Sequence, residues 1–155
     1  MDEQKDTSVA VRDATGTERR AIRFRHRFLL GISLFNAIGA LFGGTCAFLI
    51  PEFMGASLLV PLLQEIPIVG PFIDSLAWPA AALLLFICLP QSVAAAMLLR
   101  GARWRYIAAL ICNTFLIIFT TVEILVMPNP LSWAYLLLGV VGVAVSVAMS
   151  KPLLP

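Results

Sequence analysis

Residues 76–127 consist of an apolar run, a basic turn and a second apolar run. The first run, 76–99, carries no charge, and the second, 106–127, carries only Glu123. The turn between them, residues 100–105, reads RGARWR. A helix needs about 20 apolar residues to cross a bilayer, and arginines in short connections stay on the cytoplasmic side. This stretch therefore predicts a transmembrane helical hairpin with a cytoplasmic turn.

Two further apolar runs, 28–50 and 131–150, raise the number of predicted spans to four. The chain is 60% hydrophobic and 13% charged, whereas a soluble domain carries about 25% charged residues. A soluble protein of this size could not bury so much apolar surface. The predicted fold class is all-α, a polytopic membrane protein with four transmembrane helices in residues 28–150. Pro90 lies in the middle of the second span and predicts a kink there.

Three segments lie outside the predicted spans. Residues 1–27 form a polar and basic tail, of which residues 1–18 are expected to be solvated and mobile because of their mixed charge. Residues 51–75 form an apolar outer loop, in which prolines and glycines disfavour a long helix. We expect this loop to be interfacial or re-entrant. Residues 151–155 form a short cytoplasmic end.

Basic residues indicate the orientation. With the N- and C-termini in the cytoplasm, all 11 Lys and Arg lie on the cytoplasmic side, in agreement with the positive-inside rule. The expected partners of these residues are membrane lipids with anionic headgroups, and each contact contributes about 1 kcal/mol. No nucleic-acid partner is expected, because the basic run leads directly into an uncharged span. The predicted headgroup-binding residues are Arg19, Arg20, Arg23, Arg25, Arg27, Arg100, Arg103 and Arg105.

Three carboxamides lie at one predicted depth in the membrane. Counted from the nearest arginine, Asn36 and Gln91 are nine residues into their spans and Asn113 is eight. At about 1.5 Å per residue, each lies ~12–14 Å from the cytoplasmic boundary. Gly142 occupies the same level of the fourth span. Either the amides hydrogen-bond one another and set the helix register, at about 0.6 kcal/mol each, or they line a small polar pocket. We favour the first interpretation, because neutral amides commonly join helices.

Acidic residues form a second candidate group near the outer surface. Glu65 and Asp74 lie in the outer loop, and Glu123 is the one ionisable residue within a span. They could form a cation or proton site beneath the loop, although an interfacial carboxylate that reaches water is the simpler interpretation. The outer loops contain no His or Cys, so we expect no transition-metal site, and no cofactor is predicted. No span combines a nucleophile with a base or pairs two deep carboxylates, so we expect no catalytic residues and no enzyme.

Several short motifs resemble those of a known group. They are LFNAIGALFGG at 34–44, LLRGARW at 98–104, VEI at 122–124 and SW at 132–133. Together they resemble small bacterial four-helix membrane proteins of unknown function, loosely DoxX-like, over about residues 28–150. The resemblance implies the four-helix fold and a bacterial inner-membrane location, and it supplies no catalytic residue.

The sequence thus favours a non-enzymatic membrane component that binds lipid or a partner membrane protein, or that acts as an accessory subunit. The alternative is a small oligomeric transporter or channel that uses Asn36, Gln91, Asn113 and Glu123. A lipid-modifying enzyme is the weakest of the three hypotheses.

Overall fold

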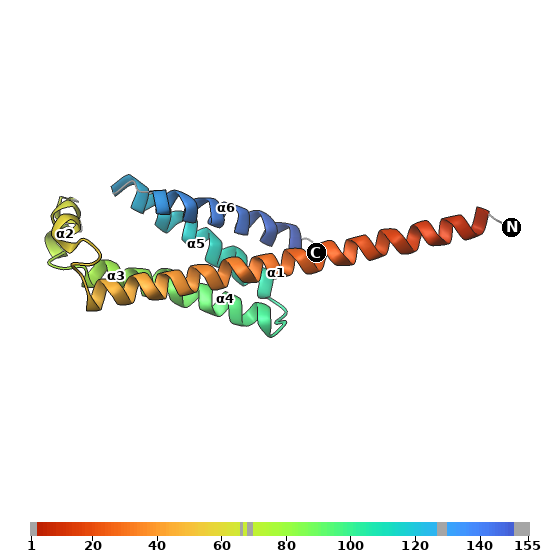
Figure 1. Cartoon of the computed structure of the whole chain (residues 1–155), viewed down its shortest axis with the longest axis horizontal. Coiled ribbons are helices and arrows are strands. Elements are labelled where there is room, and N and C mark those ends of the chain that lie inside the picture. The colour runs from red at the N-terminus through yellow and green to blue at the C-terminus, as the bar shows by residue number, and fades with distance from the viewer. Residues whose placement is uncertain (1–2, 66, 68–69, 127–129, 151–155) are drawn as a thin grey trace.

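Four long helices form an elongated bundle in the computed structural model (Figure 1). The structure describes the backbone of residues 3–65, 67, 70–126 and 130–150, and the side chains of residues 18–65, 67, 70–125 and 130–150. Within this part of the chain, four helices are long and apolar enough to cross a membrane. The predicted all-α, four-span fold is therefore confirmed, and the protein has the architecture of a multi-pass membrane protein. Residues 127–129 and 151–155, which include the end of the third predicted span and the predicted cytoplasmic end, lie outside the described residues.

The first span belongs to a helix that is much longer than the membrane is thick. Helix α1 runs over Glu3–Leu49, 47 residues, which corresponds to about 70 Å at 1.5 Å per residue. Figure 1 shows its N-terminal part extending well beyond the bundle. Residues 3–18, which the sequence predicts to be a solvated tail, have a helical backbone. The physical reason is that the first proline of the chain is Pro51, so no residue before it blocks the helix.

The second span contains an irregular turn. It consists of α3 (Ala77–Leu83), the π-helical turn η2 (Leu84–Cys88) and α4 (Leu89–Leu99). Pro90 has no N–H, and its ring would clash with the carbonyl group of residue 86 in a regular α-helix. The wider π turn directly before Pro90 accommodates both effects, with the Leu89 N–H donating to the Leu84 carbonyl group. The irregularity expected at Pro90 therefore takes the form of a π turn.

The connection between α4 and α5 (Arg105–Val126) is a tight helix cap. Gly101 has φ 68°. The Gly101 N–H donates to Leu98 O at 3.3 Å, and the Ala102 N–H donates to Met97 O at 3.0 Å. This pair of bonds is a Schellman motif, which needs a left-handed residue, usually glycine, directly after the helix. The cap places the three turn arginines together at one end of the bundle, here called the arginine end.

The opposite end, the loop end, carries the residues between α1 and α3. They include the nine-residue helix α2 (Ala56–Gln64) and the short 3-10 turn η1 (Gly70–Phe72). The Gln64 side-chain Nε2 donates to Ile73 O at 2.8 Å, which ties the end of α2 to the chain after η1. At about 1.5 Å per residue, α2 is too short to span the membrane. The predicted absence of a long helix in residues 51–75 agrees with the described part of this loop.

Two apolar clusters hold the bundle together. Helix α1 packs against α3, η2, α4 and α6 (Pro130–Ser150), and α5 packs against α4 and α6. The loop-end cluster consists of the buried residues Ala40, Ile87 and Leu116. The arginine-end cluster consists of Leu29, Ala94, Leu98, Tyr106, Ala109, Cys112 and Met149. Both clusters draw residues from at least three of the four spans.

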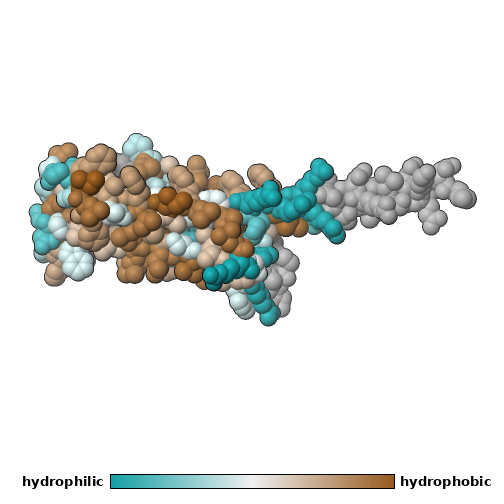
Figure 2. Space-filling model, turned by 60° about the horizontal axis from the view of Figure 1, so that its bottom comes forward, coloured by the Kyte–Doolittle hydropathy of each residue, from teal (hydrophilic) through white to brown (hydrophobic). Residues whose placement is uncertain are grey.

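The bundle surface is apolar over most of its length. Figure 2 shows hydrophobic residues along the bundle and hydrophilic residues gathered where α1 leaves it. In the most apolar window of each span, no more than 39% of the residues are buried inside the protein. Large side chains such as Phe42, Leu125 and Leu137 are more than half exposed. Exposed apolar surface on this scale is suited to contact with lipid chains rather than water.

Candidate functional site

The three carboxamides are fully buried between the two apolar clusters. Asn36, Gln91 and Asn113 each have 0% of their surface exposed. On each of the three spans, the amide lies between a residue of the arginine-end cluster and a residue of the loop-end cluster. The structure therefore places these side chains in one layer, here called the amide layer. For Gln91 and Asn113 the common depth follows from antiparallel helices, which align residues at equal distances from the turn that joins them.

Two of the three amides donate to backbone carbonyl groups, and in the described chain none bonds to another amide. Gln91 Nε2 donates to Cys112 O at 3.4 Å, across the α4–α5 interface. Asn113 Nδ2 donates to Ala109 O at 2.8 Å, within its own helix. The Cys112 thiol donates to Pro90 O at an Sγ–O distance of 3.2 Å, also between α4 and α5. The interpretation of mutually bonded amides is therefore wrong for the described structure: the Gln91 and Asn113 donors reach backbone carbonyl groups, and Asn36 makes no hydrogen bond.

Several polar atoms of the layer make no hydrogen bond within the described chain. They are both polar atoms of Asn36, Gln91 Oε1, Asn113 Oδ1 and Ser33 Oγ. Ser33 is a residue that the sequence interpretation missed; its signal is the spacing of three from Asn36, which puts both on one helix face. Buried polar atoms normally have a partner, so this layer could accept polar groups from outside the chain.

The fourth span contributes small residues to the layer. A Cβ atom on Gly142 would lie 2.5 Å from both Cγ and Oδ1 of Asn113. The absence of a side chain at this position therefore lets α5 and α6 approach until the amide touches the α6 backbone. Ser146 Oγ donates to Gly142 O at 2.7 Å and is also fully buried.

The amide layer is closed on both sides by apolar side chains. The arginine-end cluster separates it from the basic turn, and the loop-end cluster separates it from the outer loop. Leu29, Leu98 and Leu116 in these clusters are no more than 2% exposed. Water and ions do not cross such layers readily, so the amides are isolated from both surfaces in this conformation.

A large pocket, here called the loop-end pocket, lies between the outer loop and the spans. Its volume is about 750 Å³, and its walls are apolar side chains from α1, α2, η1, α3 and α5. Glu123 is the one charged residue in its lining. The other two predicted acidic residues, Glu65 and Asp74, are exposed and do not line the pocket. The structure therefore does not bring the three carboxylates of the predicted acidic site together there.

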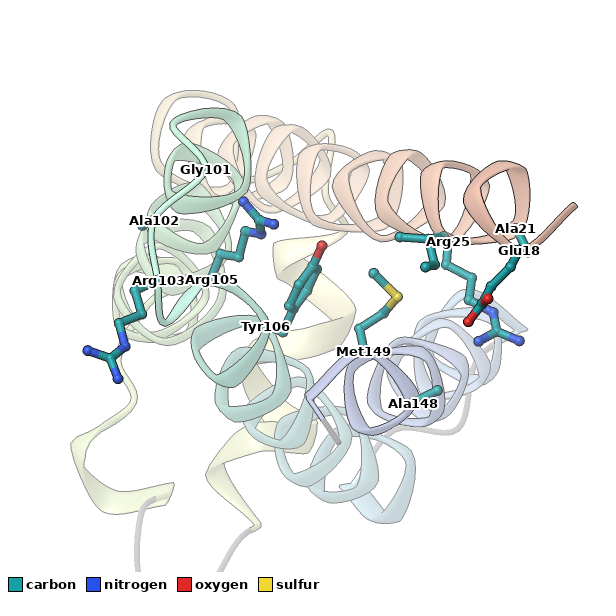
Figure 3. Close-up of a pocket in the computed structure, with 11 residues that line it drawn as sticks. Glu18, Ala21, Arg25, Gly101, Ala102, Arg103, Arg105, Tyr106, Ala148 and Met149 are labelled. Carbon is teal, nitrogen blue, oxygen red and sulfur yellow. The ribbon is translucent and has the colours of Figure 1, made fainter. Parts of the chain in front are cut away.

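A second large pocket, here called the arginine-end pocket, lies where α1, the 100–105 turn and α6 meet (Figure 3). Its volume is about 990 Å³. Arg25, Arg103 and Arg105 line it together with Glu18, and its apolar lining includes Ile22, Ala148 and Met149. The other five predicted headgroup residues do not line the pocket and are exposed: Arg19, Arg20, Arg23, Arg27 and Arg100.

Tyr106 links the elements around the arginine-end pocket. Its hydroxyl group lies 3.3 Å from His26 Nδ1 on α1, within hydrogen-bond distance. The Arg105 guanidinium lies 4.8 Å from the centre of the Tyr106 ring, as a cation–π pair. Figure 3 shows the Tyr106 and Met149 side chains side by side between α1 and α6. The Arg105 guanidinium therefore lies against the Tyr106 ring in the lining of the pocket.

No family model, curated protein or solved structure matches this chain. The resemblance to the DoxX-like group therefore stays a prediction.

Proposed function

We propose that this protein is a non-enzymatic component of the bacterial inner membrane that binds an anionic phospholipid in the arginine-end pocket. In this proposal the arginine end and both termini face the cytoplasm. The orientation rests on the positive-inside rule, since all 11 Lys and Arg occur in the tail, the 100–105 turn and at Lys151.

The observation that carries the proposal is the combination of charge and apolar lining in one pocket. Three arginines and Glu18 give the lining a net charge of +2 (three minus one). Arginine suits phosphate because its guanidinium donates two parallel hydrogen bonds to the phosphate oxygens. The apolar side chains of Ile22, Ala148 and Met149 supply a surface for the first segments of the acyl chains. A volume of about 990 Å³ is appropriate to a lipid headgroup with its glycerol.

The location of the pocket supports a lipid rather than a soluble anion. The pocket lies where the basic part of α1 continues into the apolar span, which is the level of the headgroups. At this level a headgroup contacts the arginines while its chains remain beside the exposed apolar surface of the spans. A free phosphate compound would use the charge and leave the apolar lining without a partner.

The test compares two triple variants with equal loss of charge. Arg25→Gln, Arg103→Gln and Arg105→Gln together change the pocket, and Arg19→Gln, Arg20→Gln and Arg23→Gln together change only exposed arginines outside it. At about 1 kcal/mol per arginine, the pocket variant should bind phosphatidylglycerol roughly 100-fold more weakly. Native mass spectrometry measures the lipid retained, with phosphatidylcholine as the neutral lipid.

The triple variant outside the pocket distinguishes lipid binding in the pocket from general attraction of anionic lipid to the basic surface. If both triple variants lose phosphatidylglycerol equally, the binding is a property of the whole basic surface and the pocket has no special role. If the wild-type protein retains phosphatidylcholine as well as phosphatidylglycerol, the proposal fails.

A transporter or channel is the second candidate, favoured by the unpartnered polar atoms of the amide layer. Because apolar clusters close the layer on both sides, conduction would require the helices to move apart. Replacing Asn36, Gln91 and Asn113 together by Leu tests this function. A transporter would lose solute uptake into proteoliposomes while remaining folded, whereas unchanged uptake in a folded variant would reject the amide layer as a pathway.

A further inference from the structure

We propose that the loop-end pocket binds an amphipathic organic cation, with the apolar body of the ligand in the pocket and its positive charge beside Glu123. This inference does not depend on the proposed lipid site, which lies at the opposite end of the bundle. Three properties of the pocket support it: an unneutralised carboxylate, aromatic walls and a size appropriate to a small molecule.

The first property is the lack of an internal counter-charge. Glu123 is half-buried and lines a pocket whose other lining residues are uncharged. It forms no ion pair with any residue that the structure describes. All 11 Lys and Arg of the chain lie before residue 28, in the 100–105 turn or at Lys151, and α1 carries its basic part away from the loop end (Figure 1). A carboxylate in apolar surroundings is stabilised by a positive partner, so that partner would come from outside this chain.

The second property is the aromatic lining. Phe72, Trp78 and Phe119 contribute to the pocket walls together with Glu123. Aromatic faces attract organic cations through the ring quadrupole, and tryptophan is the strongest of them. A carboxylate combined with aromatic rings is a suitable environment for a quaternary ammonium or phosphonium group.

The third property is size and donor chemistry, which exclude other ligand classes. Pockets for small molecules have volumes of about 300–1,000 Å³, and this one has about 750 Å³. A Ca²⁺ or Mg²⁺ ion requires about six oxygen ligands, whereas the side chains of this lining supply one carboxylate. A neutral apolar ligand would cover Glu123 without compensating its charge, and an anion would be repelled by it.

The experiment measures binding of radiolabelled tetraphenylphosphonium to the purified full-length protein in dodecyl maltoside. Glu123→Gln removes the charge and keeps the shape, and it should weaken binding about tenfold or more. Glu123→Asp keeps the charge and should retain most of the affinity. Glu65→Gln removes an exposed carboxylate at the same end of the bundle, outside the pocket, and should bind like wild type.

A second variant tests the proposal independently of Glu123. Trp78 is 64% exposed, so Trp78→Leu should fold normally, and it should weaken binding about threefold through the lost cation–π contact. Triphenylphosphine oxide, which is similar in shape and neutral, should compete only weakly.

Four results would overturn the proposal. The wild-type protein could show no saturable binding, or Glu123→Gln and Glu65→Gln could weaken binding equally. The neutral analogue could bind as tightly as the cation, which would assign the pocket to lipid chains. A dimer whose contact covers the pocket and excludes the cation would assign it to a second copy of the chain.

Discussion

Gly142→Ala is the substitution whose effect the structure defines most sharply. The new Cβ atom would lie 2.5 Å from Asn113 Cγ and Oδ1 and 2.9 Å from Asn113 Nδ2. Carbon atoms in contact are normally about 3.5–4.0 Å apart, so the amide or the helix must move by about 1 Å. Asn113 has 0% exposure and donates to Ala109 O at 2.8 Å. The side chain therefore cannot move away without losing this bond or disturbing its neighbours.

The expected change in the free energy of unfolding is a sum of three contributions. Overpacking a close-packed interior costs about 1–3 kcal/mol. Loss of the hydrogen bond of Asn113 adds about 0.6 kcal/mol within a membrane. The better helix propensity of alanine relative to glycine reduces this total cost by about 0.5–1 kcal/mol. Gly142→Ala should therefore lower the free energy of unfolding by roughly 2 kcal/mol.

A matched glycine provides the control. A Cβ atom on Gly31 would meet no atom within 4 Å, so Gly31→Ala should leave stability unchanged or raise it by up to about 1 kcal/mol. The assay is unfolding by sodium dodecyl sulfate in mixed micelles, followed by tryptophan fluorescence. Combining Gly142→Ala with Asn113→Ala completes a double-mutant cycle. Asn113→Ala removes the group with which the new Cβ atom collides, so Gly142→Ala should cost less stability in its presence.

Two results would refute the argument. If Gly142→Ala unfolds at the same detergent fraction as Gly31→Ala, the close approach of α5 and α6 at this level is absent. If Asn113→Ala fails to reduce the additional cost of Gly142→Ala, the collision partner is a different group.

Two further predictions concern the turn and the orientation. Gly101→Ala should lower the free energy of unfolding by about 1 kcal/mol in the same assay, because φ 68° is unfavourable for a residue with a Cβ atom. If Gly101→Ala lowers the free energy of unfolding no more than Gly31→Ala does, the capping geometry is contradicted. In intact cells, a membrane-impermeant maleimide should label a cysteine placed at Glu65 and not one placed at Ala102. The wild-type chain gives the background, since its three cysteines lie within spans, and labelling at position 102 alone would reverse the proposed orientation.

Properties that are local along the chain could be predicted from the sequence alone. Span number depends on the length of apolar runs, and the expected orientation, which stays a prediction, depends on where Lys and Arg lie between them. The common depth of Asn36, Gln91 and Asn113 also follows from counting residues, because rise per residue is constant in a helix. The structure places all three residues in one buried layer.

Properties that depend on helix rotation were decided only by the tertiary structure. Spans that are apolar all round contain no hydrophobic pattern that reveals the inward face. Sequence counting therefore could not show that Gln91 and Asn113 bond to backbone carbonyl groups or that Ser33 joins the layer. Nor could it separate Glu123, which lines a pocket, from the exposed Glu65 and Asp74. Which acidic side chain lines a pocket is set by packing between distant segments, and that information exists only in the folded chain.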